Sequence, residues 1–332
     1  MKRIMLAMIS VALLAFFCVG CSSKATPQVS EKESAESSEQ TFEIKDDIRI
    51  LVPFAAGGAV DVKARTVAEA MEAQLGVKVS VENITGGGGS ICASQFVAQD
   101  DPNTVLFTTS TVFTLSPLVT NVSFTYEDVL PLAALDGEAY GLYTCPEKSG
   151  LKTFDDVVAY GENNEIIFGS GGPTTNLHIM QAALYKELGF AFNTLPHSGA
   201  KEGLTNIMGG HSDITMAGLE TARDFVAEGM VEPVLVFLDE AYTGYEGYEV
   251  PSVLDYVETD LALQGISFFF VNKDLPTEVA SALQAAIKNA IAEPNCKETI
   301  QAMNGIDWTA MTTEEAMEYM KAENELFTTL LK

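Results

Sequence analysis

Three short loops carry residue types that could bind an anion. They are Pro53–Asp61 (PFAAGGAVD), Thr85–Ser90 (TGGGGS) and Gly169–Asn176 (GSGGPTTN). Because their residues are small, backbone N–H groups can approach a ligand closely and donate hydrogen bonds to it. A helix is expected after each loop, and the helix dipole places about half a positive charge at its N-terminus. The pattern therefore predicts binding of a small anion without an arginine.

These loops do not match the phosphate-binding motifs. None ends in the Lys-Ser/Thr pair of a P-loop, and none has GxGxxG followed by a ribose-binding acid. A single glycine-rich loop is commonly only a turn, but here three of them follow predicted strands. Asp61 has two alternative roles: it orders the first loop and caps its helix, or it meets a polar group of the ligand. Phe54 belongs either to the core or to an apolar wall of the site.

The sequence offers little support for catalysis. His178, His197 and His211 do not have the spacing of zinc ligands, and no carboxylate is spaced to complete a metal site. The GxSxG elbow of a serine hydrolase is absent. We therefore expect a protein that is not an enzyme and that uses no cofactor and no metal.

The first 41 residues are predicted to lie outside the folded part. Lys2 and Arg3 precede an apolar stretch, which is typical of a secretory signal peptide. Gly20-Cys21 then resembles a lipoprotein cleavage site, with residues 1–20 removed and lipid attached to Cys21. The alternative is ordinary signal-peptidase cleavage. Residues 21–41 are rich in Ser, Glu and Lys, so we expect a flexible tether.

The charge of the chain limits its partners. The 332 residues carry a formal net charge of −27, which argues against binding nucleic acid. The same charge repels small anions, so an anionic ligand needs a local electropositive site. No segment after the signal is long and apolar enough to cross a membrane. The remaining cysteines show no zinc spacing and are expected to be buried free thiols: Cys92, Cys145 and Cys296.

Strands and helices alternate along the rest of the chain, which indicates an α/β fold with parallel strands and right-handed crossovers. Strands are predicted at Ile48–Val52, Val77–Val81, Val105–Thr109, Tyr140–Thr144, Ile166–Gly169, Ile214–Ala217, Val234–Phe237 and Gln264–Asn272. Helices are predicted at Asp61–Leu75, Ser90–Gln99, Thr153–Tyr160, Asn176–Leu188, His197–Met208, Pro276–Ala292, Cys296–Met303 and Thr312–Lys332.

The loops, in this order, resemble those of the Bug family, the solute-binding proteins of tripartite tricarboxylate transporters. The family's opening motif PFAAGGxxDxxAR matches Pro53 to Arg65. Its second loop appears as Val81–Asn83 with Gly86–Gly89, and its third appears with changes in Gly169–Ile179. Its PTVAEAG is recognisable in Pro251–Val257. The resemblance runs from about Ile48 to the C-terminus.

The resemblance implies an α/β fold of the two-lobe, periplasmic-binding-protein-like type (type II, Venus flytrap). Each lobe is expected to be a mostly parallel sheet flanked by helices. Residues 42–135 together with 264–332 would form the first lobe, and residues 136–263 the second. Two crossovers between the lobes would then serve as a hinge.

The implied function is that of an extracytoplasmic solute-binding lipoprotein. It would capture a small organic carboxylate and deliver it to a permease with a large and a small membrane subunit. It would act as a monomer in the periplasm or at the outer face of the cell membrane, touching the membrane only through its lipid. The alternatives are a receptor for a signalling system, a secreted hydrolase, or a structural lipoprotein without a ligand.

The resemblance also implies the site residues. Thr174 and Thr175 replace the family's Gly and Ser, and Ser198 replaces a Lys, which removes a cation from the second lobe. We add Ser110, which follows the third predicted strand. The expected ligand-binding residues are Phe54, Ala55, Ala56, Gly57, Gly58, Ala59, Asp61, Ser110, Ser170, Thr174, Thr175 and Ser198.

Overall fold

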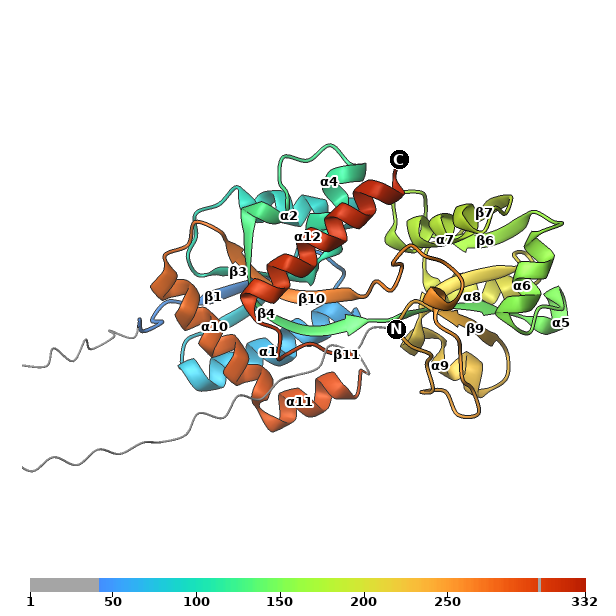
Figure 1. The fold of residues 1–332 in the computed structure, drawn as a ribbon. Helices are drawn as coiled ribbons and strands as arrows, with labels where there is room; N and C mark the ends of the chain where they lie inside the picture. The colour runs from blue at the N-terminus through green and yellow to red at the C-terminus, as the bar shows by residue number, and fades with distance from the viewer. Residues whose placement is uncertain (1–41, 304–305) are drawn as a thin grey trace, which may run out of the picture. The chain divides into compact units, whose positions relative to one another are not determined.

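Two β-sheets with flanking helices make up the structure (Figure 1). The computed structural model describes residues 42–303 and 306–332, so the predicted signal peptide and tether lie outside the described residues. The first sheet has six strands in the order β11-β4-β10-β3-β1-β2. These strands are β1 Ile48–Val52, β2 Val79–Asn83, β3 Thr104–Thr109, β4 Val129–Glu138, β10 Gly265–Asn272 and β11 Ile306–Asp307.

The second sheet has five strands in the order β7-β6-β8-β5-β9. The chain leaves the first sheet after β4, builds the whole second sheet, and returns to the first sheet at β10. Each sheet is the centre of one lobe, and two chain crossings join them. The strands of the second sheet are β5 Tyr140–Thr144, β6 Ile166–Ser170, β7 Phe192–Pro196, β8 Ile214–Gly218 and β9 Glu232–Val236.

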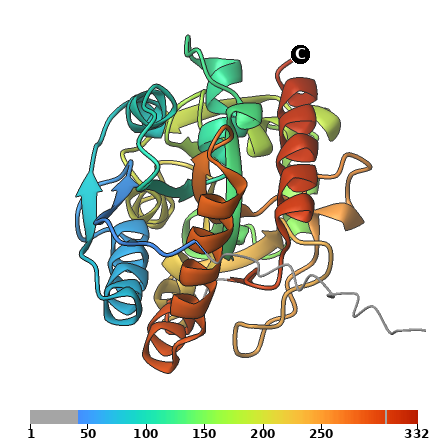
Figure 2. The same cartoon turned by 90° about the vertical axis from the view of Figure 1, so that its left-hand side faces the viewer.

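Helices surround both sheets. Figure 2 shows α1 and α10 next to one another, and the two helices contact each other. The helices before β4 and after β10 are α1 Ala59–Leu75, α2 Ser90–Val97, α3 Thr111–Thr114, α4 Ser116–Val119, α10 Thr277–Ala292, α11 Pro294–Gln301 and α12 Thr313–Leu330. Those between β5 and β9 are α5 Pro146–Ser149, α6 Phe154–Gly161, α7 Asn176–Glu187, α8 Ala200–Met208 and α9 Leu219–Ala227. Short 3₁₀ turns are η1 Gly87–Gly89, η2 Tyr126–Asp128 and η3 Val253–Asp255.

Both sheets are mixed, which corrects the expectation of mostly parallel sheets. In the first sheet β1 pairs in parallel with β2 and β3, whereas β10 runs antiparallel to both β3 and β4. In the second, β6 is parallel to β7 and β8, whereas β5 is antiparallel to β8 and β9. The antiparallel pairs involve the strands next to the crossings, which are β4, β5 and β10. They do not belong to strand–helix–strand units, so nothing requires them to be parallel.

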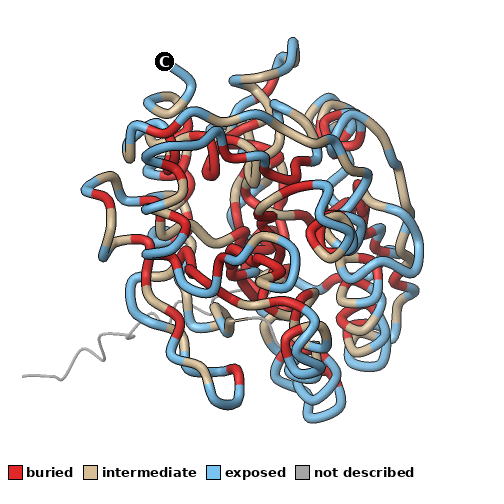
Figure 3. Tube along the Cα trace, turned by 90° about the vertical axis from the view of Figure 1, so that its right-hand side faces the viewer, coloured by how far each residue is buried: buried red, intermediate tan, exposed pale blue. Residues whose placement is uncertain are grey.

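Apolar residues are buried on both faces of each sheet. Figure 3 shows buried stretches inside the fold and exposed loops around them. In β10 the run from Ile266 to Val271 is buried throughout, as predicted for this strand. Phe107 and Phe269 on neighbouring strands stack with their ring centroids 4.3 Å apart. Such continuous apolar strands are typical of sheets that have helices on both faces.

Most predicted elements are present. The sequence analysis missed β4, β7 and α9, and also the short elements α3, α4, α5 and β11. Pro131 lies inside β4, and proline is rare within strands. It is tolerated because β11 pairs with β4 only at its far end, opposite Asp136 and Gly137. Helix α9 follows β8 directly at Gly218 without a turn signal. The helix predicted from His197 begins at Ala200, since β7 continues to Pro196.

Among residues 42–303 and 306–332, no helix combines the length and the apolar character that crossing a membrane requires.

Candidate ligand-binding site

The first loop begins after β1 and leads into α1. Pro53 lacks an N–H group and ends the strand. Gly57 has a φ of 79°, a left-handed conformation that favours glycine. Its N–H donates to Oδ2 of Asp61 at 2.8 Å, which folds the loop onto the first turn of α1. Residues Ala55 to Ala59 are exposed, so the folded loop remains accessible to a ligand.

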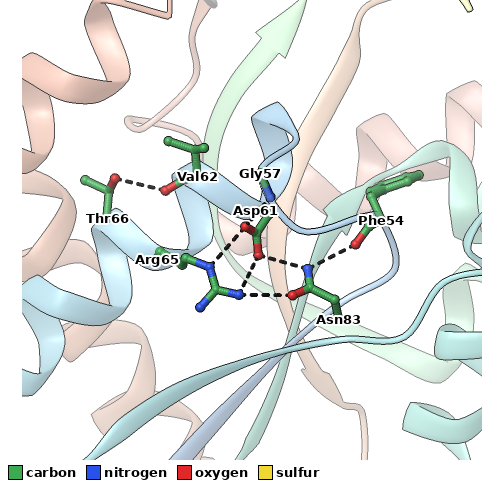
Figure 4. Close-up of polar contacts among 7 residues, drawn as sticks. All are labelled: Phe54, Gly57, Asp61, Val62, Arg65, Thr66 and Asn83. Carbon is green, nitrogen blue, oxygen red and sulfur yellow. Dashed lines mark hydrogen bonds and ion pairs between the residues drawn. The ribbon is translucent and has the colours of Figure 1, made fainter.

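Asp61 is the centre of a hydrogen-bond network (Figure 4). Besides the Gly57 N–H, its carboxylate accepts hydrogen bonds from Nε of Arg65 at 3.0 Å and from Nδ2 of Asn83 at 2.8 Å. The same Asn83 amide donates to the carbonyl oxygen of Phe54 at 3.0 Å, which ties the end of β2 to the loop. Two roles were considered for Asp61. These contacts support the role of holding the first loop in place.

The network keeps Asp61 charged. Burial raises the pKa of this carboxyl, but hydrogen bonds from Arg65, Gly57 and Asn83 outweigh burial and lower the pKa to about 2. The Asp61 side chain is 3% exposed, whereas the Arg65 side chain is 50% exposed. The carboxylate oxygens are therefore fully engaged within the loop, and Asp61 positions the loop.

Helix α1 begins without a side-chain cap. Its N-cap residue is Gly58, and no side chain accepts a hydrogen bond there. The first N–H groups of a helix have no acceptor within the helix. The helix dipole adds partial positive charge at the same end. Because the preceding residues are small and exposed, this N-terminus is accessible to an anion.

The second loop supports the first. Each glycine from Gly86 to Gly89 has a positive φ. A Cβ on Gly89 would lie 2.9 Å from Cγ2 of Val112 and 3.3 Å from Cβ of Pro53, so position 89 has room only for glycine. Ser90 follows the N-cap of α2, and its hydroxyl donates to the Gly87 carbonyl oxygen at 2.8 Å. This loop therefore packs against the start of the first loop.

The third loop is held by its own hydroxyl groups. Ser170 is buried, with its Oγ 2.9 Å from Nδ1 of His178 and accepting from the Gly172 N–H at 3.0 Å. Thr175 caps α7, because its Oγ1 accepts from the His178 N–H at 3.3 Å. The same hydroxyl donates to the Gly172 carbonyl oxygen at 2.8 Å. Thr174 is the exposed hydroxyl residue of this loop.

The other two predicted serines are engaged in local structure. The backbone N–H of Ser198 donates to Oε2 of Glu202 at 2.8 Å, and its hydroxyl donates to the same oxygen. Ser110 is fully buried and donates to Oε1 of Glu323, on α12, at 3.1 Å. Oγ1 of Thr114 donates to the other oxygen of Glu323 at 2.7 Å. Ser198 thus restrains the start of α8, and Ser110 joins α3 to α12.

A cavity of about 210 Å³ is lined by strands of the first sheet, by the helices α1 and α9, and by loop residues. The first turn of α1 contributes Ala59 and Val60, and the first turn of α9 contributes Leu219 to Thr221. Like α1, helix α9 begins at a glycine, Gly218, without a side-chain cap. Two uncapped helix N-termini, one from each lobe, therefore line one cavity. Its other polar lining residues include Lys63, Thr109, Asp136, Glu138 and Ser267.

Of the residues predicted for the site, Ala59 is the one that lines this cavity in the described part of the chain. Sequence reasoning missed Lys63, Asp136, Glu138 and the start of α9. Lys63 forms an ion pair with Asp136 in which both side chains are largely buried. Asp136 and Glu138 lie at the end of β4, whose sequence VLPLAALDGE was not recognised as a strand. The sequence did contain one indication of these residues, because two carboxylates, Asp136 and Glu138, end an apolar run.

The histidines and cysteines were considered as metal ligands and as free thiols. Within residues 42–303 and 306–332, no three His, Cys, Asp or Glu side chains are arranged to hold a metal ion. Desolvation lowers the pKa of His178, which is bonded to Ser170, and also that of His197. A Cβ on Gly203 would lie 2.9 Å from Nε2 of His197, so this ring is packed against α8. The predicted free, buried thiols are confirmed for Cys92, Cys145 and Cys296.

The fold matches that of solved solute-binding proteins. A TctC solute binding protein from Polaromonas superposes with a TM-score of 0.73 at 21% identity, covering 86% of this chain and 98% of that one. MatC from Rhodopseudomonas palustris, solved with bound malate, superposes with a TM-score of 0.70 at 18% identity, covering 86% and 99%. This chain therefore has the two-lobe α/β fold of periplasmic solute-binding proteins.

The sequence comparison identifies the family. Residues 63–332 match the model of the tripartite tricarboxylate transporter family receptor, and the chain belongs to that family. A UPF0065 protein of Bordetella pertussis is 26% identical over 282 residues, which cover 82% of this chain and 85% of the relative. The resemblance inferred from the loops is confirmed. The chain is a solute-binding protein of a transport system and not an enzyme, so the hydrolase alternative is wrong.

Proposed function

We propose that this protein captures a small organic carboxylate in the cavity and delivers it to a permease with a large and a small membrane subunit. The main support is that the uncapped N-termini of α1 and α9 line the same cavity. Helix N-termini attract carboxylates, and a chain with a net charge of −27 needs such a local site. The malate bound to MatC, which has the same fold, agrees with this ligand class.

In this proposal the first loop holds a ligand carboxylate through backbone N–H groups. The exposed Ala55, Ala56 and Ala59 supply these donors, because the N–H groups of Gly57 and Gly58 already donate within the loop. Phe54 supplies an apolar wall. The second lobe contributes the start of α9, which lines the cavity. Thr174 is exposed on the third loop outside the cavity lining and would approach the ligand on closure. The remaining predicted residues act on the ligand by shaping the structure around it: Asp61, Ser110, Ser170, Thr175 and Ser198.

The proposed lobes are residues 42–135 with 264–332, and residues 136–263. Closure on the ligand would occur at the two crossings, between β4 and β5 and before β10. Contacts that are better in the closed state would drive it. Residues 1–20 would be removed as a signal peptide, and lipid on Cys21 would anchor the protein outside the cytoplasm through the tether 21–41.

A thermal-denaturation screen with malate, citrate, adipate and aromatic acids tests the ligand class. A ligand present at about 100 times its Kd adds about 2.7 kcal/mol to the free energy of unfolding. We expect at least one carboxylate to raise the unfolding midpoint, while neutral analogues of the same size leave it unchanged. If no carboxylate raises the midpoint, the proposal is wrong.

Gly58→Leu tests the contact with the first loop. Gly58 has a φ of −75°, which a residue with a side chain can adopt, and it lies at the exposed start of α1. The added side chain should obstruct the helix N-terminus and weaken carboxylate binding by about tenfold or more. Gly199→Leu is the matched control, because Gly199 is the uncapped N-cap of α8 and an added Cβ meets no atom within 4 Å. Unchanged affinity in folded Gly58→Leu protein would argue against the loop contact.

A further inference from the structure

The cavity assigned to the carboxylate is lined by more negative than positive side chains. Among the described lining residues Lys63 is the one cation, and it already forms an ion pair with Asp136. Glu138 and Glu220 also line the cavity, and Glu220 pairs with Arg223. A ligand with negative charge alone would therefore meet the carboxylate of Glu138 beside a single lysine, Lys63, which already pairs with Asp136.

Asp136 carries a buried oxygen that lacks a hydrogen-bond donor. The residue is 2% exposed, and Lys63 donates to its Oδ2. In the described part of the chain, Oδ1 of Asp136 has no hydrogen-bond partner. A buried acceptor without a donor costs about 1–3 kcal/mol, and more when it is charged. A residue that lines the cavity therefore carries a buried oxygen that an additional donor would stabilise.

Glu138 lies two residues further along the same strand. Alternate residues of a strand point to the same face, so Glu138 and Asp136 present their carboxylates to the same side of β4. Glu138 is accessible to solvent, and its Oε2 accepts one long hydrogen bond, from the Tyr140 hydroxyl at 3.4 Å. Desolvation by the surrounding protein raises the pKa of Glu138, and the charge of Lys63 opposes this. Both carboxylates thus have acceptor capacity left.

We infer that the ligand carries a protonated amine beside its carboxylate, as an amino acid does, and that Glu138 and Oδ1 of Asp136 bind the amine. An ammonium group has three N–H donors, enough to reach both carboxylates. The ligand carboxylate then lies at the N-terminus of α1. The cavity of about 210 Å³ is smaller than the roughly 300 Å³ at which drug-sized sites begin, so the amino acid is small. This inference rests on the proposed function and narrows its ligand class.

Calorimetric titration of matched acid pairs tests the inference. The pairs are propionate with alanine, succinate with aspartate, and adipate with 2-aminoadipate, each differing only in the amine. In at least one pair the amino acid is expected to bind about tenfold tighter or better, as charge-assisted hydrogen bonds would give. Glu138→Gln keeps the shape of the side chain and should reduce that preference to about twofold or less, by weakening the amino acid alone.

Glu228→Gln is the control, because it makes the same change of net charge at an exposed position at the far end of α9. It should leave both affinities unchanged. If the acids without an amine bind as tightly as the amino acids, the inference is wrong while the proposed function stands. Binding of these acids that requires an added divalent cation, and is lost with a chelator, also overturns it. If no member of any pair binds, the proposed function is wrong and the inference is wrong with it.

Discussion

Replacing Asp61 with Asn tests whether the carboxylate holds the first loop. Asn has the same shape but no charge, and its amide nitrogen cannot accept a hydrogen bond. In the protein, Gly57, Arg65 and Asn83 all donate to the carboxylate oxygens of Asp61. With Asn at this position, at least one of these donors faces another donor. We therefore expect a less stable protein with a loosened loop.

The pKa of Asp61 gives the size of the effect. Its value of about 2, against 3.8 for an unperturbed Asp, is a shift of nearly two units. At 1.36 kcal/mol per unit, the charged form stabilises the fold by about 2 kcal/mol. For a chain of this length that corresponds to about 5 °C in the unfolding midpoint. Because the pKa is lower in the folded state, this contribution is complete above about pH 4 and is lost as the pH falls toward 2.

Urea denaturation of wild type and Asp61→Asn at pH 7 and at pH 3 measures this directly. The difference in unfolding free energy should be about 2 kcal/mol at pH 7 and clearly smaller at pH 3. Asp239→Asn serves as the control, because Asp239 is exposed and its removal should change little. Asp61→Asn should also bind more weakly to the carboxylate that the thermal screen identifies, because the loosened loop of the variant must become ordered on binding.

Two results would refute this reasoning. One is equal stability of wild type and Asp61→Asn at pH 7, which would mean that the hydrogen bonds to the carboxylate do not stabilise the fold. The other is a stability difference that is the same at pH 7 and pH 3, which would mean that the charge of Asp61 is not its source.

Two further predictions concern buried positions. Burial raises the pKa of Glu323 to about 7, above the ordinary 4.5. The contribution of Glu323 to stability should therefore be complete below pH 4.5 and fall by about 3 kcal/mol as the pH rises from 4.5 through 7. Urea denaturation of Glu323→Gln should lack this loss, and an identical pH dependence would contradict the assignment. In thermal unfolding, Gly89→Ala should cost about 2 kcal/mol, because its Cβ would meet Val112. Gly88→Ala, with open space around it, should cost only backbone strain of about 1 kcal/mol; equal losses would contradict the packing argument.

Local patterns were sufficient for the elements with strong periodicity or strong end signals. The strand at Ile48–Val52 and the strand at Tyr140–Thr144 were predicted with the bounds observed. Helix α1 was predicted to within two residues, because apolar residues recur at helical spacing and Gly76 ends it in a left-handed conformation. Strand β4 was missed, because Pro131 and the alanines around it are poor strand formers. Its pairing with β10 over its whole length outweighs that local preference.

The candidate site divides in the same way. The first loop, with its small residues, and the helix that follows it could be predicted. The conformation there depends on neighbours a few residues apart. The partnership of Asp61 with Asn83 could not, since it joins residues on α1 and β2. Ser110 looked available in the sequence, but α12 packs over it and Glu323 takes its hydroxyl.

The sequence by itself determined the class of the chain, its family, and the small residues of the loop after β1, for which we propose anion binding. These follow from composition and from short stretches of neighbouring residues. Tertiary structure alone decided which surfaces meet. It brought the start of α9, the start of α1 and the end of β4 together around one cavity. The physical reason is that the cavity depends on strand pairing between segments distant in the chain, which no local pattern encodes.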